Sequence, residues 1–315
     1  METTYLDRNT CLKQPCVGTI GFFDGVHRGH RFLIGCVTSA AKDSDLQSVV
    51  ITFDKHPRQV LQSDYVPQLL TTTEEKLQLL SETGIDRVVV LHFTPEMAAM
   101  SAFDFMDTVL RRQLHMRKLI IGYDNHFGQG GNEGFSDYIR YGKELGIDVE
   151  AAPPFEPGGG VHVSSSQVRR LLAEGDIVSA NQCLGYTYTL GGTVTHGFAE
   201  GRRIGFPTAN IDPQTVEQMI PAAGVYAVSV MLPGHSGSFG GMLNIGSRPT
   251  FGGKDVTIEV NIFDFIGNLY EQKLRVGFLG RIRSERKFSS VEALAAQLAD
   301  DRLKAETIMN HTTFL

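Results

Sequence analysis

The stretch GTIGFFDGVHRGH, residues 18–30, decides the fold of the first half of the chain. It overlaps a short apolar run, residues 17–22, which predicts a buried strand. A glycine-containing segment follows and leads into an amphipathic pattern, so the stretch predicts a strand, a tight turn and a helix in direct succession. Such a helix has free backbone N–H groups in its first turn, and these groups suit a phosphate.

Two histidines flank one glycine at the start of this predicted helix. Gly29 has no side chain, so a ligand can approach the backbone closely at that point. His27 and His30 can donate hydrogen bonds to phosphate oxygens as charge builds up on them. The HxGH pattern directly after a first strand therefore predicts nucleotidyl transfer, and the alternative is a helix-capping turn with two hydrogen-bonded histidines.

The length and composition are typical of a globular protein with two domains. The chain has 315 residues, of which 42% are hydrophobic and 20% are charged. Its formal net charge of −6 argues against a broad nucleic-acid surface, which would need clustered lysines and arginines. No apolar run approaches the roughly 20 residues that span a bilayer, so a membrane partner is not expected either.

The cysteines and histidines show no metal-binding spacing. No CxxC pattern occurs among Cys11, Cys16, Cys36 and Cys183, so neither a zinc ribbon nor a redox pair is indicated. The 10 histidines form no HxxxH or HExxH pattern, so a histidine-based zinc site is not expected. Because no signal peptide is visible, reduced thiols and a cytoplasmic location are expected.

The first half of the chain alternates between short apolar strands and amphipathic helices. The predicted strands cover residues 17–22, 48–53, 87–91, 118–122 and 148–152. Besides the helix after the HxGH pattern, the predicted helices cover residues 74–83, 101–114, 133–145, 165–174 and 176–184. This alternation predicts an α/β, Rossmann-like domain over residues 1–184, with a parallel sheet and helices on both faces.

The second half has a different texture. Short β-type runs separated by glycine- and proline-rich turns cover residues 191–195, 225–230, 240–243, 256–263 and 273–278. They predict a small closed β-barrel over residues 185–315. A last amphipathic helix, from Val291 to about residue 305, is expected to pack across the barrel.

A second candidate phosphate site follows the loop that contains Pro157 and three glycines. Ser164 and Ser165 stand at the start of a predicted helix, where hydroxyl groups cap the helix and can also face a phosphate. Arg169 lies one helical turn further on, so its guanidinium can reach the same anion. The alternative is an ordinary helix cap with a surface arginine.

The second half contains PTAN, residues 207–210, after a basic and glycine-rich stretch. Thr208 and Asn210 are two residues apart, so their side-chain oxygens lie on one side of an extended chain. Two neutral oxygen ligands together with phosphate oxygens suit Mg²⁺. The alternative is a proline-anchored loop in which asparagine is a turn residue.

Four segments of the first half together resemble the FAD synthetase module of the bacterial bifunctional riboflavin kinase/FAD synthetases. The segments are GFFDGVHRGH (21–30), TFDKHPRQVL (52–61), IGYDNHFGQG (121–130) and VSSSQVRRLLAEGDI (163–177). The resemblance implies that His27 and His30 stabilise the ATP phosphates during attack. It implies that Asp124 helps to shape the nucleotide site, and that the triphosphate is held by Ser164, Ser165 and Arg169.

Five segments of the second half resemble the riboflavin kinase module of the same family. They are GRRIGFPTANI (201–211), GVYAVSV (224–230), NIGSRPTF (244–251), IEVNIFDF (258–265) and RIRSERKFSS (281–290). The resemblance implies that Thr208 and Asn210 hold Mg-ATP. It also implies that Glu259 accepts the proton of the riboflavin 5′-hydroxyl, a role that a positioned carboxylate can perform.

The resemblance implies a two-step enzyme with Mg²⁺ as cofactor and with riboflavin, FMN, FAD and ATP as its small-molecule partners. Riboflavin would be phosphorylated to FMN, and AMP would then be transferred to FMN to give FAD and pyrophosphate. The sequence departs from the family pattern at Asn125, Ser166 and Asn261, where the family usually has phenylalanine, threonine and histidine.

Three other functions stay open at this point. A riboflavin kinase with a weakened, nucleotide-binding first half is favoured by the altered segment 121–130. A non-catalytic flavin carrier or regulator is disfavoured, because a pure binder needs no acid–base or metal groups. A different HxGH nucleotidyltransferase, such as a tRNA ligase, is disfavoured by the acidic balance and by the absence of a KMSKS lysine.

Overall fold

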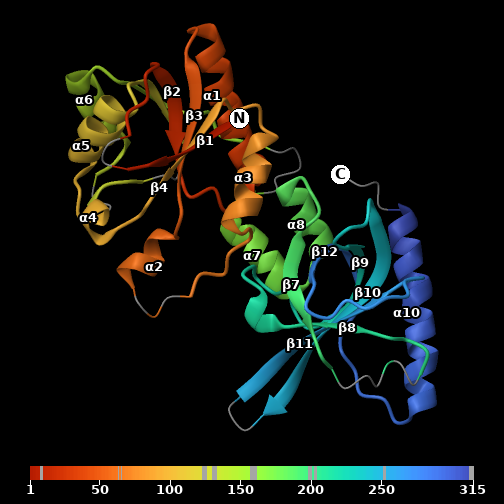
Figure 1. Cartoon of the computed structure of the whole chain (residues 1–315). Helices are drawn as coiled ribbons and strands as arrows, with labels where there is room; N and C mark the ends of the chain where they lie inside the picture. Colours follow the sequence, from red (N-terminus) through yellow and green to blue (C-terminus); the bar gives the residue numbers. More distant parts are fainter. Residues whose placement is uncertain are drawn as a thin grey trace. The chain divides into compact units, whose positions relative to one another are not determined.

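Figure 1 shows the chain as a computed structural model. The structure describes residues 1–7, 10–62, 64, 66–122, 126–129, 133–156, 162–197, 201, 204–250 and 253–311. Contacts between residues divide the chain into two compact units. The first unit comprises Met1–Pro67 and Thr71–Val163, and the second comprises Gln68–Leu70 and Ser164–Leu315.

The first unit is built on a parallel sheet. Its strands are β1 (Glu2–Leu6), β2 (Cys16–Ile20), β3 (Gln47–Phe53), β4 (Arg87–Leu91), β5 (Met116–Ile121) and β6 (Asp148–Ala151). They lie in the order β1-β4-β3-β2-β5-β6, and every neighbouring pair is parallel. The order changes direction between β2 and β5, which in open sheets of this kind is where ligands bind. The predicted α/β architecture is confirmed.

Helices cover both faces of this sheet (Figure 1). One face packs against α1 (Arg28–Asp43) and α3 (Thr73–Ser81) through residues such as Ile34 and Leu80. The other packs against α5 (Ala102–Phe105), the π-helical turns Met106–Gln113 that continue it, and α6 (Phe135–Leu145). The short helices α2 (Pro57–Leu61) and α4 (Pro95–Ala98) and the edge strand β1 were not predicted. Since β1 is mostly exposed, it carries no strong apolar signal.

The second unit contains a closed antiparallel barrel. Its strands are β7 (Thr189–Thr195), β8 (Ala209–Ile211), β9 (Gly224–Met231), β10 (Ser238–Thr250), β11 (Gly253–Ile262) and β12 (Lys273–Arg283). They close in the order β10-β11-β8-β7-β12-β9, which confirms the predicted barrel. Residues on β7 alternate between buried and partly exposed, as expected for a strand with one face in a core.

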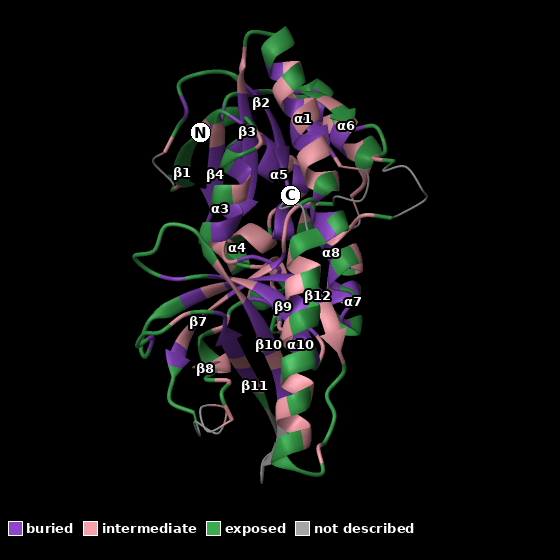
Figure 2. Cartoon of the chain, turned by 90° about the vertical axis from the view of Figure 1, so that its right-hand side faces the viewer, coloured by how far each residue is buried: buried purple, intermediate pink, exposed green. Residues whose placement is uncertain are grey.

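Helix α10 (Val291–His311) packs on the outside of the barrel wall. Ala305 contacts a cluster with Ala227, Met242 and Leu279, from three different strands. Figure 2 shows that the outward side of α10 is exposed or partly exposed. Leu303 is 64% exposed and Val291 is 58% exposed, so these two apolar residues of the predicted amphipathic helix do not face the barrel.

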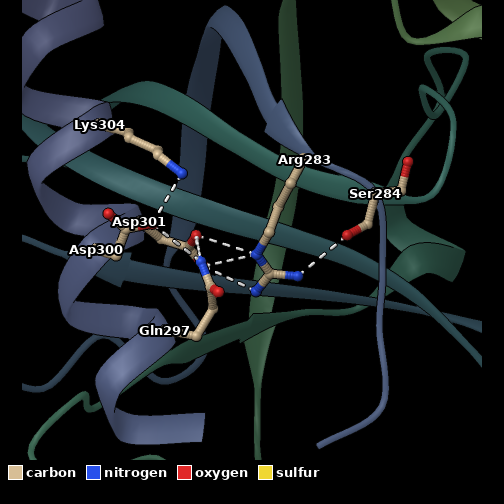
Figure 3. Close-up of polar contacts among 6 residues, drawn as sticks. All are labelled: Arg283, Ser284, Gln297, Asp300, Asp301 and Lys304. Atoms are coloured by element: carbon tan, nitrogen blue, oxygen red, sulfur yellow. Dashed lines mark hydrogen bonds and ion pairs between the residues drawn. The ribbon is translucent and has the colours of Figure 1, made fainter. Parts of the chain in front are cut away.

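A buried ion pair fixes α10 to β12. Figure 3 shows Arg283 beside Asp301, which is completely buried. The guanidinium makes three hydrogen bonds to the carboxylate, of 2.8 to 3.0 Å, and Gln297 adds a fourth of 2.7 Å. Such a bidentate pair sets the position of the helix as well as holding it.

Two helices precede the barrel in the second unit, α7 (Ser165–Glu174) and α8 (Ile177–Leu184). Asn181 of α8 donates to the Phe278 carbonyl of β12 at 2.9 Å and accepts from the backbone of Tyr188 at 2.8 Å. Both helices therefore belong to the same compact unit as the barrel. A functional boundary between residues 184 and 185 stays a prediction.

Candidate active sites

The turn between β2 and α1 has a strained backbone. The φ angle is +55° at Phe23, +76° at Gly25 and +35° at Val26. Glycine adopts such angles easily, but phenylalanine and β-branched valine do not, and each such residue costs about 1–3 kcal/mol. The turn follows β2 at the point where the strand order reverses. Strain of this kind persists where the surrounding structure holds the backbone in place, which is common at active sites.

The two histidines of the HxGH pattern lie together at the end of this turn. His27 is the N-cap of α1, and its Nδ1 accepts a hydrogen bond from the backbone N–H of His30 at 3.2 Å. The imidazole rings are stacked, with centroids 3.6 Å apart. Because Nδ1 accepts, the neutral His27 ring has its proton on Nε2 and can donate from there. His27 therefore caps the helix, as the alternative interpretation expected, and its ring also lies against His30.

His30 is kept uncharged by its surroundings. Burial, and then the charges of His27 and Lys76, hold its pKa well below the usual value of a histidine. Its Nδ1 is buried and has no hydrogen-bond partner within the described part of the chain. Gly29 lies directly against His27: a Cβ there would be 3.3 Å from the His27 ring and 3.6 Å from the Val163 carbonyl oxygen. Two imidazole rings at the N-terminus of a helix suit a phosphate chain.

One charged residue of this region was missed in the sequence. Lys76 of α3 is only 2% exposed, and burial lowers its pKa to about 8. The helical pattern contains a signal for it, because Lys76 lies four residues before the buried Leu80 and so on the same face of α3.

The serines and the arginine of the second phosphate element lie at the start of α7. Ser164 is the N-cap, and its Oγ accepts from the backbone N–H of Gln167 at 3.2 Å. Ser165 is the first residue of the helix, and Arg169 donates from Nε to the Gln68 carbonyl at 2.7 Å. The capping role is confirmed, whereas phosphate contact stays a prediction. Asp124 lies outside the described residues.

The barrel has a cavity on the face that α10 covers. Its volume is about 300 Å³, and its polar lining includes Thr208, Asn244, Glu259, Asn261 and Arg283. Apolar residues of α10 and of the barrel complete the wall. Thr208 and Glu259, which the sequence predicted as site residues, thus line this cavity. Asn244 and Asn261, which the sequence did not assign to a site, line it as well.

The strand register brings Glu259 and Asn210 together. Glu259 on β11 is directly opposite Asn210 on β8 and Asn244 on β10, so the three side chains share one face. Asn210 also packs closely on Gly197, where a Cβ would be 2.2 Å from the amide nitrogen. A larger residue at that position would force the Asn210 side chain to move. Amide, hydroxyl and carboxylate oxygens are the ligands that Mg²⁺ prefers.

Asn261 holds the PTAN segment in place. It is 6% exposed, and its amide donates to the Pro207 carbonyl at 2.7 Å. Asn261 and Glu259 are two residues apart on β11 and share a face, so one strand carries both the candidate base and an anchor for Thr208. Thr208 also lines a second hollow of about 160 Å³, together with Asn268 and Tyr270.

Comparison with known proteins identifies the family. The profile of the FAD synthetase family matches residues 10–167, and that of the riboflavin kinase family matches residues 184–309. The bifunctional riboflavin kinase/FMN adenylyltransferase of Escherichia coli K12 is 37% identical over 300 residues, which are 95% of each chain. The chain belongs to the bifunctional riboflavin kinase/FMN adenylyltransferase family. The family member from Bacillus subtilis is 35% identical and covers 92% of this chain and 91% of its own length.

The fold of this family member also matches a solved structure. A Streptococcus pneumoniae chain, titled a macrolide-efflux protein, superposes with a TM-score of 0.86 at 30% sequence identity. The match covers 97% of this chain and 99% of the other. Among the described residues, no helix has the length and apolar character needed to cross a membrane.

Proposed function

We propose that the two reactions of this family take place at the two sites described above. The enzyme is a riboflavin kinase and an FMN adenylyltransferase. The barrel would phosphorylate riboflavin with ATP, and the parallel-sheet unit would transfer AMP from a second ATP to FMN, with release of pyrophosphate. The observation that carries this assignment is that each compact unit contains its own set of converging polar groups, His27 with His30 and Asn210 with Glu259.

In the kinase reaction, Glu259 would accept the proton of the riboflavin hydroxyl as that oxygen attacks the γ-phosphorus. Phosphoryl transfer depends mostly on positioning and charge stabilisation, so a carboxylate is a sufficient base. Thr208 and Asn210 would hold Mg²⁺, whose chemistry is to neutralise the charge of the ATP phosphates. Thr208 lines both hollows, which supports a reaction between two ligands bound on its two sides.

In the adenylyl transfer, His27 and His30 would donate to phosphate oxygens of ATP while the FMN phosphate attacks the α-phosphorus. Both rings are fixed before the ligand binds, so they stabilise developing charge at little cost in reorganisation. Gly29 would leave room for the phosphates. By the resemblance of their motifs, Asp124, Ser164, Ser165 and Arg169 would also contribute to nucleotide binding.

The organisation we propose is an adenylyltransferase domain over residues 1–184 and a kinase domain over residues 185–315. A cytoplasmic location is supported by the need for ATP and by the thiols. All four cysteines lie in the described part of the chain and are free, and burial raises the pKa of Cys16 to about 12, which makes that thiol inert.

The deciding experiment is incubation of the purified full chain with riboflavin, ATP and Mg²⁺, followed by chromatography of the flavins. We expect FMN to appear first and FAD afterwards, with one pyrophosphate released for each FAD. FMN as the sole product would indicate a riboflavin kinase whose first unit is inactive. Absence of any product would indicate a flavin carrier. Omission of Mg²⁺ should stop FMN formation.

A further inference from the structure

A single buried cation joins the carboxyl ends of two neighbouring strands. The ammonium of Lys76 donates to the Phe53 carbonyl at 2.9 Å and to the Phe22 carbonyl at 3.3 Å. Phe53 is the last residue of β3, and Phe22 lies just beyond β2. The ammonium also lies over the Phe22 ring, 4.2 Å from its centroid. Lys76 therefore holds the chain at the start of the strained turn.

A second set of contacts holds the middle of the same turn. Asp24 is 4% exposed and accepts from the backbone N–H of Thr71 at 3.2 Å. The N–H of Gly25 in turn donates to the Thr71 hydroxyl at 3.2 Å. Both Thr71 and Lys76 lie near or on the first turns of α3. The beginning of α3 is thus the support on which the turn before His27 rests.

The charge of Lys76 is stabilised by two acids and is close enough to affect His30. Asp24 and Asp54 act against burial and raise the pKa of Lys76, whereas the positive charge of Lys76 lowers the pKa of His30. A buried cation is costly, and an apolar side chain would be cheaper for stability alone. The cost is understandable if the cation has a task in the reaction.

We propose that Lys76 is a positioning residue for adenylyl transfer, which fixes the strained turn so that His27 and His30 meet the phosphates in one geometry. The inference rests on the function proposed above for this pair. Its two carbonyl contacts set the start of the turn, and its charge adds to burial in holding the pKa of His30 low. Lys76 acts through the histidines and not on the substrate.

The test uses the full chain with Lys76→Met, which keeps the side-chain length and removes the donors and the charge. The matched control is Lys42→Met, at an exposed lysine of α1 in the same unit. We expect kcat for FAD formation from FMN to fall about 10²-fold in Lys76→Met, since misplacing catalytic groups by about 1 Å has effects of that size. KM for ATP should change much less, and the control should match the wild type.

Two further variants guard against loss of folding. Lys76→Arg keeps a cation that donates to carbonyl groups and should recover part of kcat, and Lys76→Gln keeps one donor and should lie between Met and Arg. Riboflavin kinase activity of each variant reports on the integrity of the rest of the chain. Equal kcat in Lys76→Met, Lys76→Gln and the wild type would overturn the proposal. It would also be overturned if Lys76→Arg folds but recovers none of the kcat that Lys76→Met loses.

An NMR titration of the histidine rings separates positioning from bulk stability. The groups around His30 and Lys76 that titrate or carry charge are His27, Asp24 and Asp54. The pKa of His30 should rise in Lys76→Met and stay unchanged in Lys42→Met, and an unmoved His30 would contradict the proposal. His30→Ala is assayed alongside. If His30→Ala retains the wild-type rate of FAD formation, the proposed active site is wrong. If His30→Ala loses this rate and Lys76→Met keeps it, the active site stands and the role proposed for Lys76 is wrong.

Discussion

The two candidate sites are built by opposite means. The site in the first unit depends on an irregular turn with positive φ at Phe23 and Val26, which a buried lysine and an aspartate hold from outside. The site in the barrel depends on regular strand register, which places Asn210, Glu259 and Asn244 side by side without strain. The first site concentrates imidazole donors, and the second concentrates oxygen acceptors. A transferred phosphate needs donors to receive its charge, whereas a metal and a hydroxyl proton need acceptors.

The sharpest separation of the two sites comes from Glu259→Gln. Loss of a positioned base should reduce FMN formation from riboflavin about 10²–10⁴-fold. Conversion of FMN to FAD should be unchanged, because Glu259 belongs to the barrel. Both rates can be measured by flavin chromatography on one preparation.

The matched control for this change is Glu285→Gln, at a second carboxylate that lines the same cavity. It should keep most of the kinase rate, because we assign it no proton transfer. Similar losses in both variants would mean that the cavity needs negative charge and not a base at Glu259.

His30→Ala should give the reverse pattern. Removal of one fixed donor to a developing oxyanion typically reduces kcat about 10²–10³-fold, so FAD formation should fall by that factor while FMN accumulates. His27→Ala should act similarly, and the double variant should lose less than the product of the two effects, since both rings serve one phosphate chain. The measurement is pyrophosphate release from FMN and saturating ATP. Wild-type turnover in both single variants would reduce the HxGH segment to a structural turn.

The buried lysine of the first site predicts a dependence of stability on pH. The pKa of Lys76 falls from 10.5 in the unfolded chain to about 8 in the fold, so between these values the unfolded chain binds one more proton. The free energy of unfolding therefore rises with pH in this window, by about 2 kcal/mol from pH 8 to pH 10 for this group alone.

The comparison of wild type with Lys76→Met isolates this contribution, because the other titrating groups are shared. Urea unfolding at both pH values should show that the wild type gains stability relative to Lys76→Met as pH rises. Lys42→Met should follow the wild type. Parallel curves for wild type and Lys76→Met would show that the Lys76 ammonium has its ordinary pKa.

The smallest expected effect concerns the anchor of PTAN. Asn261→Ala removes one hydrogen bond, worth about 0.5–1.5 kcal/mol, so KM for ATP in the kinase reaction should rise roughly 2–10-fold. Asn261→His keeps a ring N–H that can donate to the Pro207 carbonyl, and it should stay close to the wild type. Steady-state kinetics of FMN formation measure both. If alanine and histidine behave alike, the Pro207 contact does not position Thr208.

Local patterns predicted most of the fold and part of the sites. Alternation of apolar runs and amphipathic helices was sufficient for the parallel sheet, and the pairing of His27 with His30 follows from their spacing on one helical turn. The register that sets Asn210 opposite Glu259 depends on contacts between distant strands, and no local pattern contains it. Lys76 was missed because a lysine in a helix is normally exposed, and its burial depends on backbone carbonyl groups and acids that lie elsewhere in the sequence. The short elements β1 and β8 gave too weak a signal.

The position of α10 in the chain has a consequence for synthesis on the ribosome. Leu294 and Leu298 of this helix form part of the wall of the barrel cavity, and Arg283 and Asp301 bind the helix to β12. The strained turn of the first unit, by contrast, is held by Thr71 and Lys76, which come much earlier in the chain. Since domains fold as units in the order of their translation, the nascent chain can close the turn of the proposed adenylyl-transfer site long before the proposed kinase cavity has a complete wall. The reaction that comes second in the conversion of riboflavin to FAD would thus be the first for which a newly made chain is ready.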